Sequence, residues 1–220
     1  MPTIILIVCL GLLIWVEPAS AIDYPLKVKV HEDLQLQPDD YGRDADSILR
    51  RASRLLTRHC GNTINLKRNG KITTFKSVPS TIGTPADRDA VHRVPAEVKV
   101  VKTIDYCVEA PQPGKPPVLG CSFREDRHPR KTISMIVVRD HPNPDANPNL
   151  WAHELGHNTG LHHRDDPDPL KRPLMTPCDI QTVNQVVTKD ECSCFLAGPG
   201  NGLKACTMPD PFLICRDPPH

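Results

Sequence analysis

The sequence predicts an α+β fold, because helix patterns and strand patterns alternate along its 220 residues. Apolar residues recur at helical spacing from about Ala45 to Arg58. The segment Leu26 to Leu36 begins with apolar–basic alternation, which is typical of a half-exposed strand. Ile133 to Val138 is a continuous apolar run, as in a strand buried on both faces. These three observations predict a helix, a half-exposed strand and a fully buried strand in one chain.

Turn signals bound the first helix and interrupt the segment after it. Pro38 to Gly42 contains Pro, Asp and Gly and indicates a turn, so that Asp44 or Asp46 would cap the helix. Ile64 to Phe75 contains Asn69-Gly70, the dipeptide of tight hairpins. We therefore expect two short strands joined by a hairpin turn in this segment.

Further strands and a last helix complete the predicted order. Pro95 to Tyr106 and Val118 to Phe123 are strand candidates. Thr188 and Glu191 have the spacing of a capping box, in which each side chain bonds to the backbone amide of the other residue. A short helix around Cys192 to Leu196 should follow.

Three histidines and a glutamate between residues 153 and 163 form the most informative pattern of the chain. A helix places His153 and His157 on one face, one turn apart, where they can share a metal ion. Glu154 can reach a water on that ion without binding the metal itself. His163 would point away if the helix continued. Gly160 can end the helix, because glycine adopts the left-handed conformation without steric cost, and the chain can then return His163 as a third ligand.

This pattern predicts a catalytic zinc site rather than a structural one. Three protein ligands leave the fourth position of zinc open. Zinc lowers the pKa of a bound water toward ~7 and polarises a carbonyl, and Glu154 would move that water's proton to the leaving amine. The alternative is a solvated helix end that happens to be rich in histidine. The helix should begin near Leu150, capped by Asn147 or Asn149.

The motif H-E-x-x-H-x-x-G-x-x-H at residues 153–163, followed by Met175, resembles the signature of the metzincin zinc endopeptidases. By this resemblance the three histidines bind zinc, Glu154 is the general base, and Met175 lies in a Met-turn beneath the metal. The implied fold is a twisted mixed β-sheet with a zinc-binding active-site helix, a Met-turn and a C-terminal helix. The resemblance covers about residues 22 to 197.

Two further features bear on the resemblance. The residue after the third histidine helps to mark the metzincin subfamily, and Arg164 is not what the matrix-degrading, adamalysin, astacin or serralysin branches lead us to expect. The subfamily therefore stays open. In the family an edge strand binds extended substrate, and residues 118–123 are the candidate here, unless they form an ordinary hairpin strand held by Cys121. The pocket beside the scissile bond would be walled by about Pro177 to Val187.

The N-terminal residues indicate export. Ile4 to Val16 is an apolar run of 13 residues, too short to span a bilayer, which takes about 20. Ala19-Ser20-Ala21 is a small-residue cleavage pattern. We expect a signal peptide at 1–21, a zinc metallopeptidase catalytic domain at 22–197 and a Cys-containing tail packed on it at 198–220. The expected location is extracellular, or periplasmic in a Gram-negative bacterium, and the alternative is an uncleaved N-terminal anchor.

Cysteine usage supports an oxidising compartment. The chain has 9 cysteines, and removing Cys9 of the apolar run leaves an even number, which in an exported chain indicates disulfides. Eight cysteines allow about 105 pairings. We expect Cys107 with Cys121, across a Pro-rich loop, and Cys206 with Cys215. A second, thiolate zinc site is the alternative.

Composition limits the partners. With 27 basic and 26 acidic residues the net charge is +1, which favours neither nucleic acid nor an anionic membrane. We expect a monomer that hydrolyses a protein or peptide substrate with one Zn²⁺ and makes no stable membrane association after signal cleavage. The Asp-rich loops at 143–149 and 165–168 could bind calcium, although they show no recognisable ligand pattern. The alternative function is a secreted zinc-binding interaction protein with the same fold and an occluded or inactive cleft.

Overall fold

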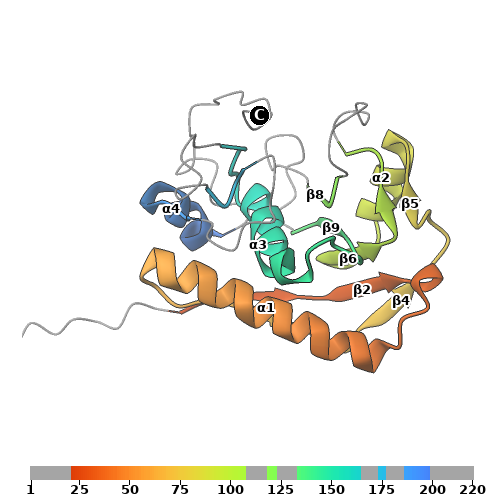
Figure 1. Ribbon diagram of the computed structural model, residues 1–220, viewed down its shortest axis with the longest axis horizontal. Helices are drawn as coiled ribbons and strands as arrows, with labels where there is room; N and C mark the ends of the chain where they lie inside the picture. Colours follow the sequence, from red (N-terminus) through yellow and green to blue (C-terminus); the bar gives the residue numbers. More distant parts are fainter. Residues whose placement is uncertain (1–20, 108–117, 123–132, 165–172, 177–185, 199–220) are drawn as a thin grey trace, which may run out of the picture.

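A five-stranded mixed sheet forms the centre of the computed structural model, which describes residues 21–107, 118–122, 133–164, 173–176 and 186–198 (Figure 1). Its strand order is β4-β2-β6-β9-β8, and all neighbours are parallel except β8, which runs antiparallel to β9. The strands are β2 (Val28–His31), β4 (Thr73–Phe75), β6 (Val98–Val101), β8 (Gly120–Ser122) and β9 (Met135–Val138). The α+β prediction is thus confirmed with a mixed sheet.

The two central strands are buried on both faces. All four residues of β9 are buried, as the continuous apolar run predicted, and so are all four of β6. β6 carries one polar exception, since Lys99 is only 1% exposed. β8 lies at the end of the strand order, so the prediction of a short edge strand at residues 118–123 is confirmed for Gly120–Ser122.

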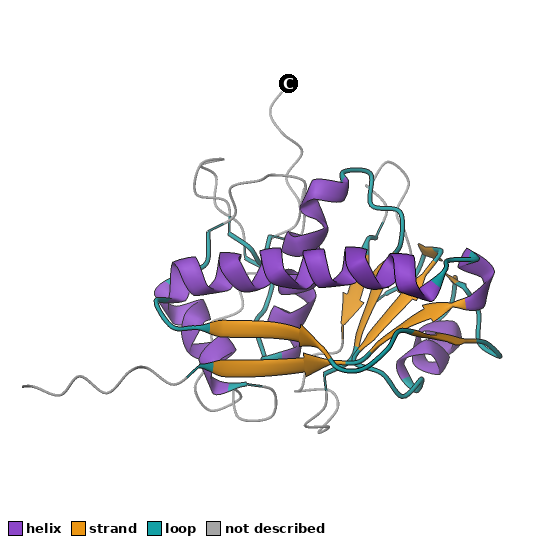
Figure 2. Ribbon diagram, turned by 90° about the horizontal axis from the view of Figure 1, so that it is seen from below, coloured by secondary structure: helices purple, strands orange, loops and turns teal. Residues whose placement is uncertain are grey.

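Two smaller sheets flank the main one. β1 (Ile22–Leu26) pairs in parallel with β3 (Ile64–Arg68), and β5 (Thr81–Ile82) pairs in parallel with β7 (Thr103–Ile104). The long helix α1 (Pro38–Cys60) runs alongside β1 and β3 and contacts β3, as the view from below shows (Figure 2). Two 3-10 turns, η1 (Glu32–Leu34) and η2 (Pro144–Ala146), complete the short elements.

Helix α1 (Pro38–Cys60) is longer than the sequence predicted. The prediction of a turn at Pro38 to Gly42 is wrong, because Pro38 occupies the first helical turn, where its missing amide hydrogen has no partner to lose. Gln37 is the N-cap residue, so neither Asp44 nor Asp46 caps the helix. Gly61 ends it in the left-handed conformation, with φ 67°.

The predicted hairpin between Ile64 and Phe75 is also wrong. The two strands exist, but β3 pairs with β1 and β4 pairs with β2. Gly70 does adopt a positive φ of 80°, so the Asn-Gly signal located a turn correctly. The turn leads from β3, which pairs with β1 in a small sheet, to β4, which pairs with β2 in the main sheet.

Two shorter helices lie on opposite sides of the molecule (Figure 1). α2 (Pro85–His92) was not predicted, although the Thr84 side chain caps it by accepting from the Asp87 amide. α4 (Lys189–Ala197) begins at the predicted capping box, in which Thr188 and Glu191 bond reciprocally, and it ends at Gly198.

The main apolar core lies between α1, the sheet and α3 (Asn147–Asn158). Its buried residues include Leu49, Ala52 and Leu56 of α1, together with Trp151 and Leu155 of α3. Figure 1 shows α3 standing directly above α1, which it contacts. Burying one leucine of this kind contributes about 1.5–3 kcal/mol, so this packing fixes the position of α3.

Two disulfides tie the described elements together. Cys107–Cys121 is the predicted pair, and Cys60–Cys192 joins the end of α1 to α4 across 132 residues. The expected pair Cys206–Cys215, the signal peptide and the 198–220 tail beyond Gly198 lie outside the described residues. Among the residues that the structure describes, no helix is long and apolar enough to cross a membrane.

Candidate metal centre

Helix α3 starts earlier than the sequence predicted. It begins at Asn147, directly after η2, and Ala146 precedes it as an N-cap without a side-chain hydrogen bond. The predicted caps, Asn147 and Asn149, are therefore both inside the helix. The Asn143 side chain instead accepts from the Asp145 amide and starts η2, which runs on into α3. A 3-10 turn at the start satisfies the first amides and takes over the role of a cap.

The helix ends where the motif requires. α3 stops at Asn158, and Gly160 has φ 97°, as a residue that ends a helix in the left-handed region needs. The amide of Leu161 then donates back to the Gly156 carbonyl at 3.0 Å. This closure turns the chain so that His163 faces the helix instead of continuing along it.

The structure brings the three histidines together. Nε2 of His157 lies 3.1 Å from Nε2 of His153 and 3.1 Å from Nε2 of His163. The candidate ligand atoms of the three residues all lie within 4.8 Å of one another. His153 and His157 are buried, whereas His163 is exposed. The site thus consists of His153 and His157 on α3 and of His163 in the segment after Gly160.

Hydrogen bonds at the far side of two rings determine which nitrogen faces the centre. Nδ1 of His153 lies 2.7 Å from the Leu174 carbonyl, and Nδ1 of His157 lies 2.9 Å from the Leu161 carbonyl. A carbonyl oxygen only accepts, so each Nδ1 carries the hydrogen and each Nε2 presents a lone pair. Burial also lowers the pKa of His153 to about 4, which keeps that ring neutral. Two lone pairs that face each other at 3.1 Å repel unless a cation lies between them.

The spacing matches a tetrahedral zinc ion. A Zn–N bond is about 2.0–2.1 Å, so two nitrogens on a tetrahedral ion lie roughly 3.3 Å apart. The two measured separations of 3.1 Å are close to that value. Backbone carbonyls that accept from Nδ1 are the usual outer partners of zinc-binding histidines. Within the described residues, this is the one group of three or more His, Cys, Asp or Glu side chains placed to share an ion.

Glu154 follows His153 on α3, and its carboxyl group faces the edge strand β8. It is 3% exposed, and burial raises its pKa to about 8, although the Ser122 hydroxyl acts in the opposite direction. A Cβ atom added to Gly120 would lie 2.2 Å from Oε1 of Glu154, so the backbone of β8 passes directly over the carboxyl group. Oε2 has no hydrogen-bond partner among the described residues. A cation at the triad would supply the missing electrostatic partner.

Met175 packs against α3, the helix that carries His153 and His157. It is fully buried, and a Cβ atom on Gly156 would lie 2.5 Å from its Sδ. Gly156 is therefore the residue that lets the Met175 segment approach the helix. The sequence motif gave no reason for a glycine at this variable position, and this role was missed.

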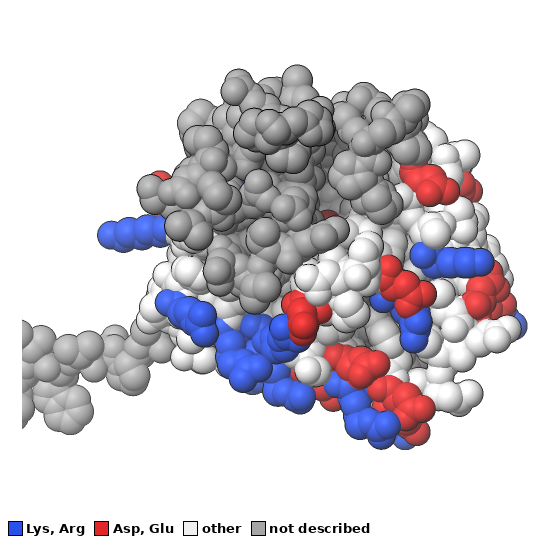
Figure 3. Space-filling model, in the orientation of Figure 1, with Lys and Arg blue, Asp and Glu red and all other residues white. Residues whose placement is uncertain are grey.

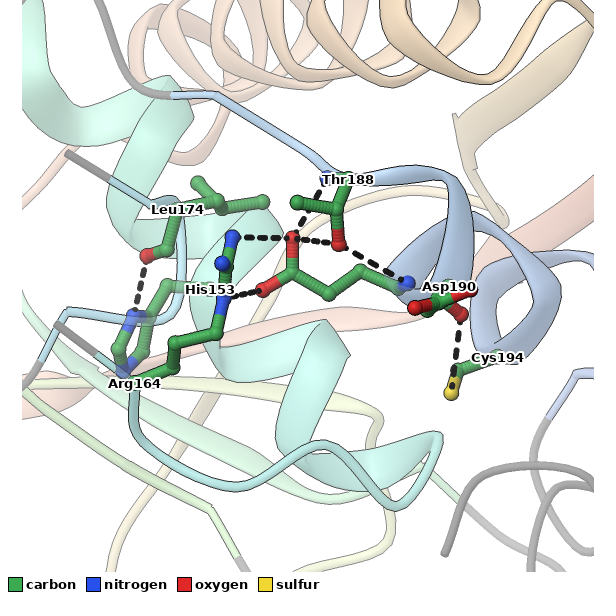
Figure 4. A network of polar contacts seen from close by, with 7 residues as sticks. His153, Arg164, Leu174, Thr188, Asp190 and Cys194 are labelled. Atoms are coloured by element: carbon green, nitrogen blue, oxygen red, sulfur yellow. Dashed lines mark hydrogen bonds and ion pairs between the residues drawn. The ribbon is translucent and has the colours of Figure 1, made fainter. Parts of the chain in front are cut away.

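Arg164 connects the third histidine to α4. Its guanidinium donates to both carboxylate oxygens of Glu191, at 2.9 and 3.2 Å, and Glu191 is 1% exposed (Figure 4). The same carboxylate accepts from the Thr188 amide and hydroxyl, at 2.7 and 3.0 Å. The Arg164 amide donates to the Met175 carbonyl at 2.9 Å. Arg164, which matches none of the named metzincin branches, thus links the segment of His163 to both the Met175 segment and helix α4.

The remaining predicted features are placed only in part. Of the proposed pocket wall at Pro177 to Val187, only the last two residues are described. The calcium candidate at 165–168 lies outside the described residues. In the other candidate loop, Asp145 forms an ion pair with Arg51 at 3.0 Å.

Comparisons with known proteins leave the family open. No family model matches the chain, and no curated protein matches it. One similar solved structure is titled "Structure of a chaperone-substrate complex", with a TM-score of 0.46 and 14% identity over 86% of this chain. The match covers 35% of that chain, so this chain spans about a third of its length. A likeness of this extent assigns neither a family nor a function.

Proposed function

We propose that this protein is a zinc-dependent endopeptidase of the metzincin type. The observation that carries the proposal is the convergence of three Nε2 atoms, two of them 3.1 Å from the third, beside a buried carboxyl group. His153, His157 and His163 would hold the ion. Zinc, when bound there, would acidify a water molecule and polarise a substrate carbonyl.

The role of Glu154 follows from where its carboxyl group lies. It follows His153 on α3 and is held against β8, the edge strand that would present a substrate. Its free oxygen, Oε2, would accept a proton from the attacking water and then donate it to the leaving amine. A low-dielectric site strengthens this transfer because few solvent dipoles compete for the charge.

Substrate would bind as an additional strand. β8 pairs with β9 on one side and ends the strand order of the main sheet. An extended peptide on its outer edge would gain backbone hydrogen bonds, and its side chains would alternate toward and away from the cleft. Such binding does not select a sequence, so the walls of the cleft would set specificity.

Export is part of the same proposal. The described residues contain two disulfides, one of which closes a loop of more than a hundred residues. Disulfides of this kind persist in oxidising compartments. We infer that residues 1–21 are removed as a signal peptide and that the mature protein works outside the cytoplasm.

A peptide-library digest tests the proposed activity. The protein carrying residues 22–220 is incubated with mixed peptides, and the fragments are read by mass spectrometry, with Glu154→Gln as the matched control. Gln has the shape of Glu but cannot accept the proton, so we expect cuts from the wild type and at least a 100-fold loss in the variant. Zinc content near one per chain without any cleavage by the wild type would instead support the zinc-binding interaction protein.

A further inference from the structure

A row of arginines marks the outer face of α1. Arg50, Arg54 and Arg58 follow one another at four-residue intervals, so they lie one above the other on the helix surface, and all three are exposed. Figure 3 shows Lys and Arg side chains gathered along the edge of the molecule where Figure 1 places α1. The chain as a whole is almost neutral, so this concentration is local.

The ordinary explanations of such a row do not account for it. Like charges four residues apart destabilise a helix by roughly 0.2–0.5 kcal/mol per pair. The helix dipole favours basic residues in the last turn, but Arg50 and Arg54 lie before that turn. Among the described residues no ion pair involves any of the three arginines. Asp46, one turn before Arg50 on α1, is already bonded twice by Arg68, at 2.8 and 2.9 Å, and Arg50 adds only a minor contribution to the lowered pKa of that carboxyl group.

A depression lies beside two of these arginines. It has a volume of about 440 Å³ and is lined by Ser53, Arg54, Thr57, Arg58, Thr63 and Asn65. The Ser53 and Thr57 hydroxyls of the lining already bond to the backbone of β3, and the Asn65 amide donates to Asp23. The two guanidinium groups are therefore what the lining offers to an anionic ligand. The depression opens on the side of α1 that is turned away from α3, since the opposite face of α1 packs into the core.

We propose that this face binds a sulfated polysaccharide. Guanidinium groups recognise sulfate and carboxylate groups through paired hydrogen bonds, and a row one helical turn apart matches a polymer with repeated anionic groups. The carbon atoms of the lining belong to arginine stems and threonine methyls, which suit the C–H faces of sugar rings.

Other anionic polymers fit the lining less well. Single-stranded nucleic acid is bound by aromatic side chains that stack on bases, and the lining contains none. A membrane surface calls for Trp, Phe or Leu beside the basic residues, and these are absent from the lining as well. An acidic protein partner would meet no apolar centre of the kind that protein interfaces bury.

Calorimetry with a heparin hexasaccharide as the probe tests the proposal on the protein of residues 22–220. We expect binding at about 150 mM salt, and at least tenfold weaker binding of the fully desulfated hexasaccharide. Arg54→Ser/Arg58→Ser should weaken binding at least about tenfold, because it removes two charge-assisted contacts. The matched control is Arg93→Ser/Lys76→Ser, which removes the same charge from exposed positions outside α1 and should change affinity less than about twofold.

Several results would overturn the proposal. These are no binding by the wild type, equal binding of the desulfated probe, or equal losses in the two double variants. Tighter binding of a single-stranded oligonucleotide or of phosphatidylserine vesicles would assign the face to another partner. Binding should be unchanged in Glu154→Gln, so this test does not depend on the proposed activity. All the substituted side chains except that of Glu154 are exposed, and equal thermal unfolding midpoints would show that the surface variants fold.

Discussion

Replacing Lys99 with methionine should stabilise the protein at neutral and acidic pH. The side chain is 1% exposed, and its ammonium nitrogen donates to the Ser134 hydroxyl at 2.6 Å. Burial lowers the pKa of Lys99 from 10.5 to about 7, although Glu97 acts in the opposite direction. A difference of about 3.5 pKa units, at about 1.36 kcal/mol each, sets the cost of burying the charged form near 4–5 kcal/mol.

The sign of the pH dependence follows from the same values. Between about pH 7 and 10.5 the unfolded chain holds a proton on Lys99 that the folded chain lacks, so the free energy of unfolding rises with pH in this window. Below pH 7 the folded protein carries the full penalty. From pH 6 to 9 this group alone should raise the free energy of unfolding by about 2.5 kcal/mol in the wild type, and Lys99→Met should lack that rise.

Urea unfolding at pH 6 and pH 9, with the disulfides intact, measures both quantities. Lys99→Met should exceed the wild type by about 3–4 kcal/mol at pH 6, after the loss of one hydrogen bond worth about 1 kcal/mol. The gap should shrink by more than half at pH 9. Lys102→Met, at an exposed position three residues further along the chain, should show no pH-dependent gap. Equal gaps for Lys99→Met at the two pH values would refute the reasoning.

Three further substitutions test the packing around the site. Glu191→Gln should lower the free energy of unfolding by about 3 kcal/mol and weaken zinc binding, because Arg164 loses its buried partner; unchanged zinc affinity in a competition titration would contradict this role. Gly156→Ala should cost about 1–3 kcal/mol by overpacking, and a double-mutant cycle with Met175→Ala should recover part of it; additive losses would show that the two do not meet. Cys60→Ser with Cys192→Ser should cost about 2–5 kcal/mol in urea unfolding, and a smaller loss would mean that other contacts of α4 hold it in place.

The parts of the fold that could be predicted from the sequence are those determined by interactions between residues close together in the chain. The spacing of His153 and His157, the left-handed residue at Gly160, and the capping box before α4 depend on interactions within a few residues. The continuous apolar run of β9 was equally informative, because burial on both faces removes the need for polar alternation.

The errors lie where distant segments compete for a residue. Asn69-Gly70 predicted a hairpin, but strands β1 and β2 took the two partners into separate sheets. The error at Pro38 is local, because the same residue types begin helices and turns. Residues that support the site were missed for a related reason, since Arg164 meets Glu191 across 27 residues and no local pattern announces that pair.

Zinc K-edge absorption spectroscopy on the purified protein tests the central claim most directly. The account predicts one zinc per chain in a shell of three imidazole nitrogens and one oxygen at about 2.0–2.1 Å, with one nitrogen lost in His163→Ala. A sulfur shell at about 2.3 Å would place the metal on cysteines instead. That result, or a protein that binds no zinc, would contradict the account.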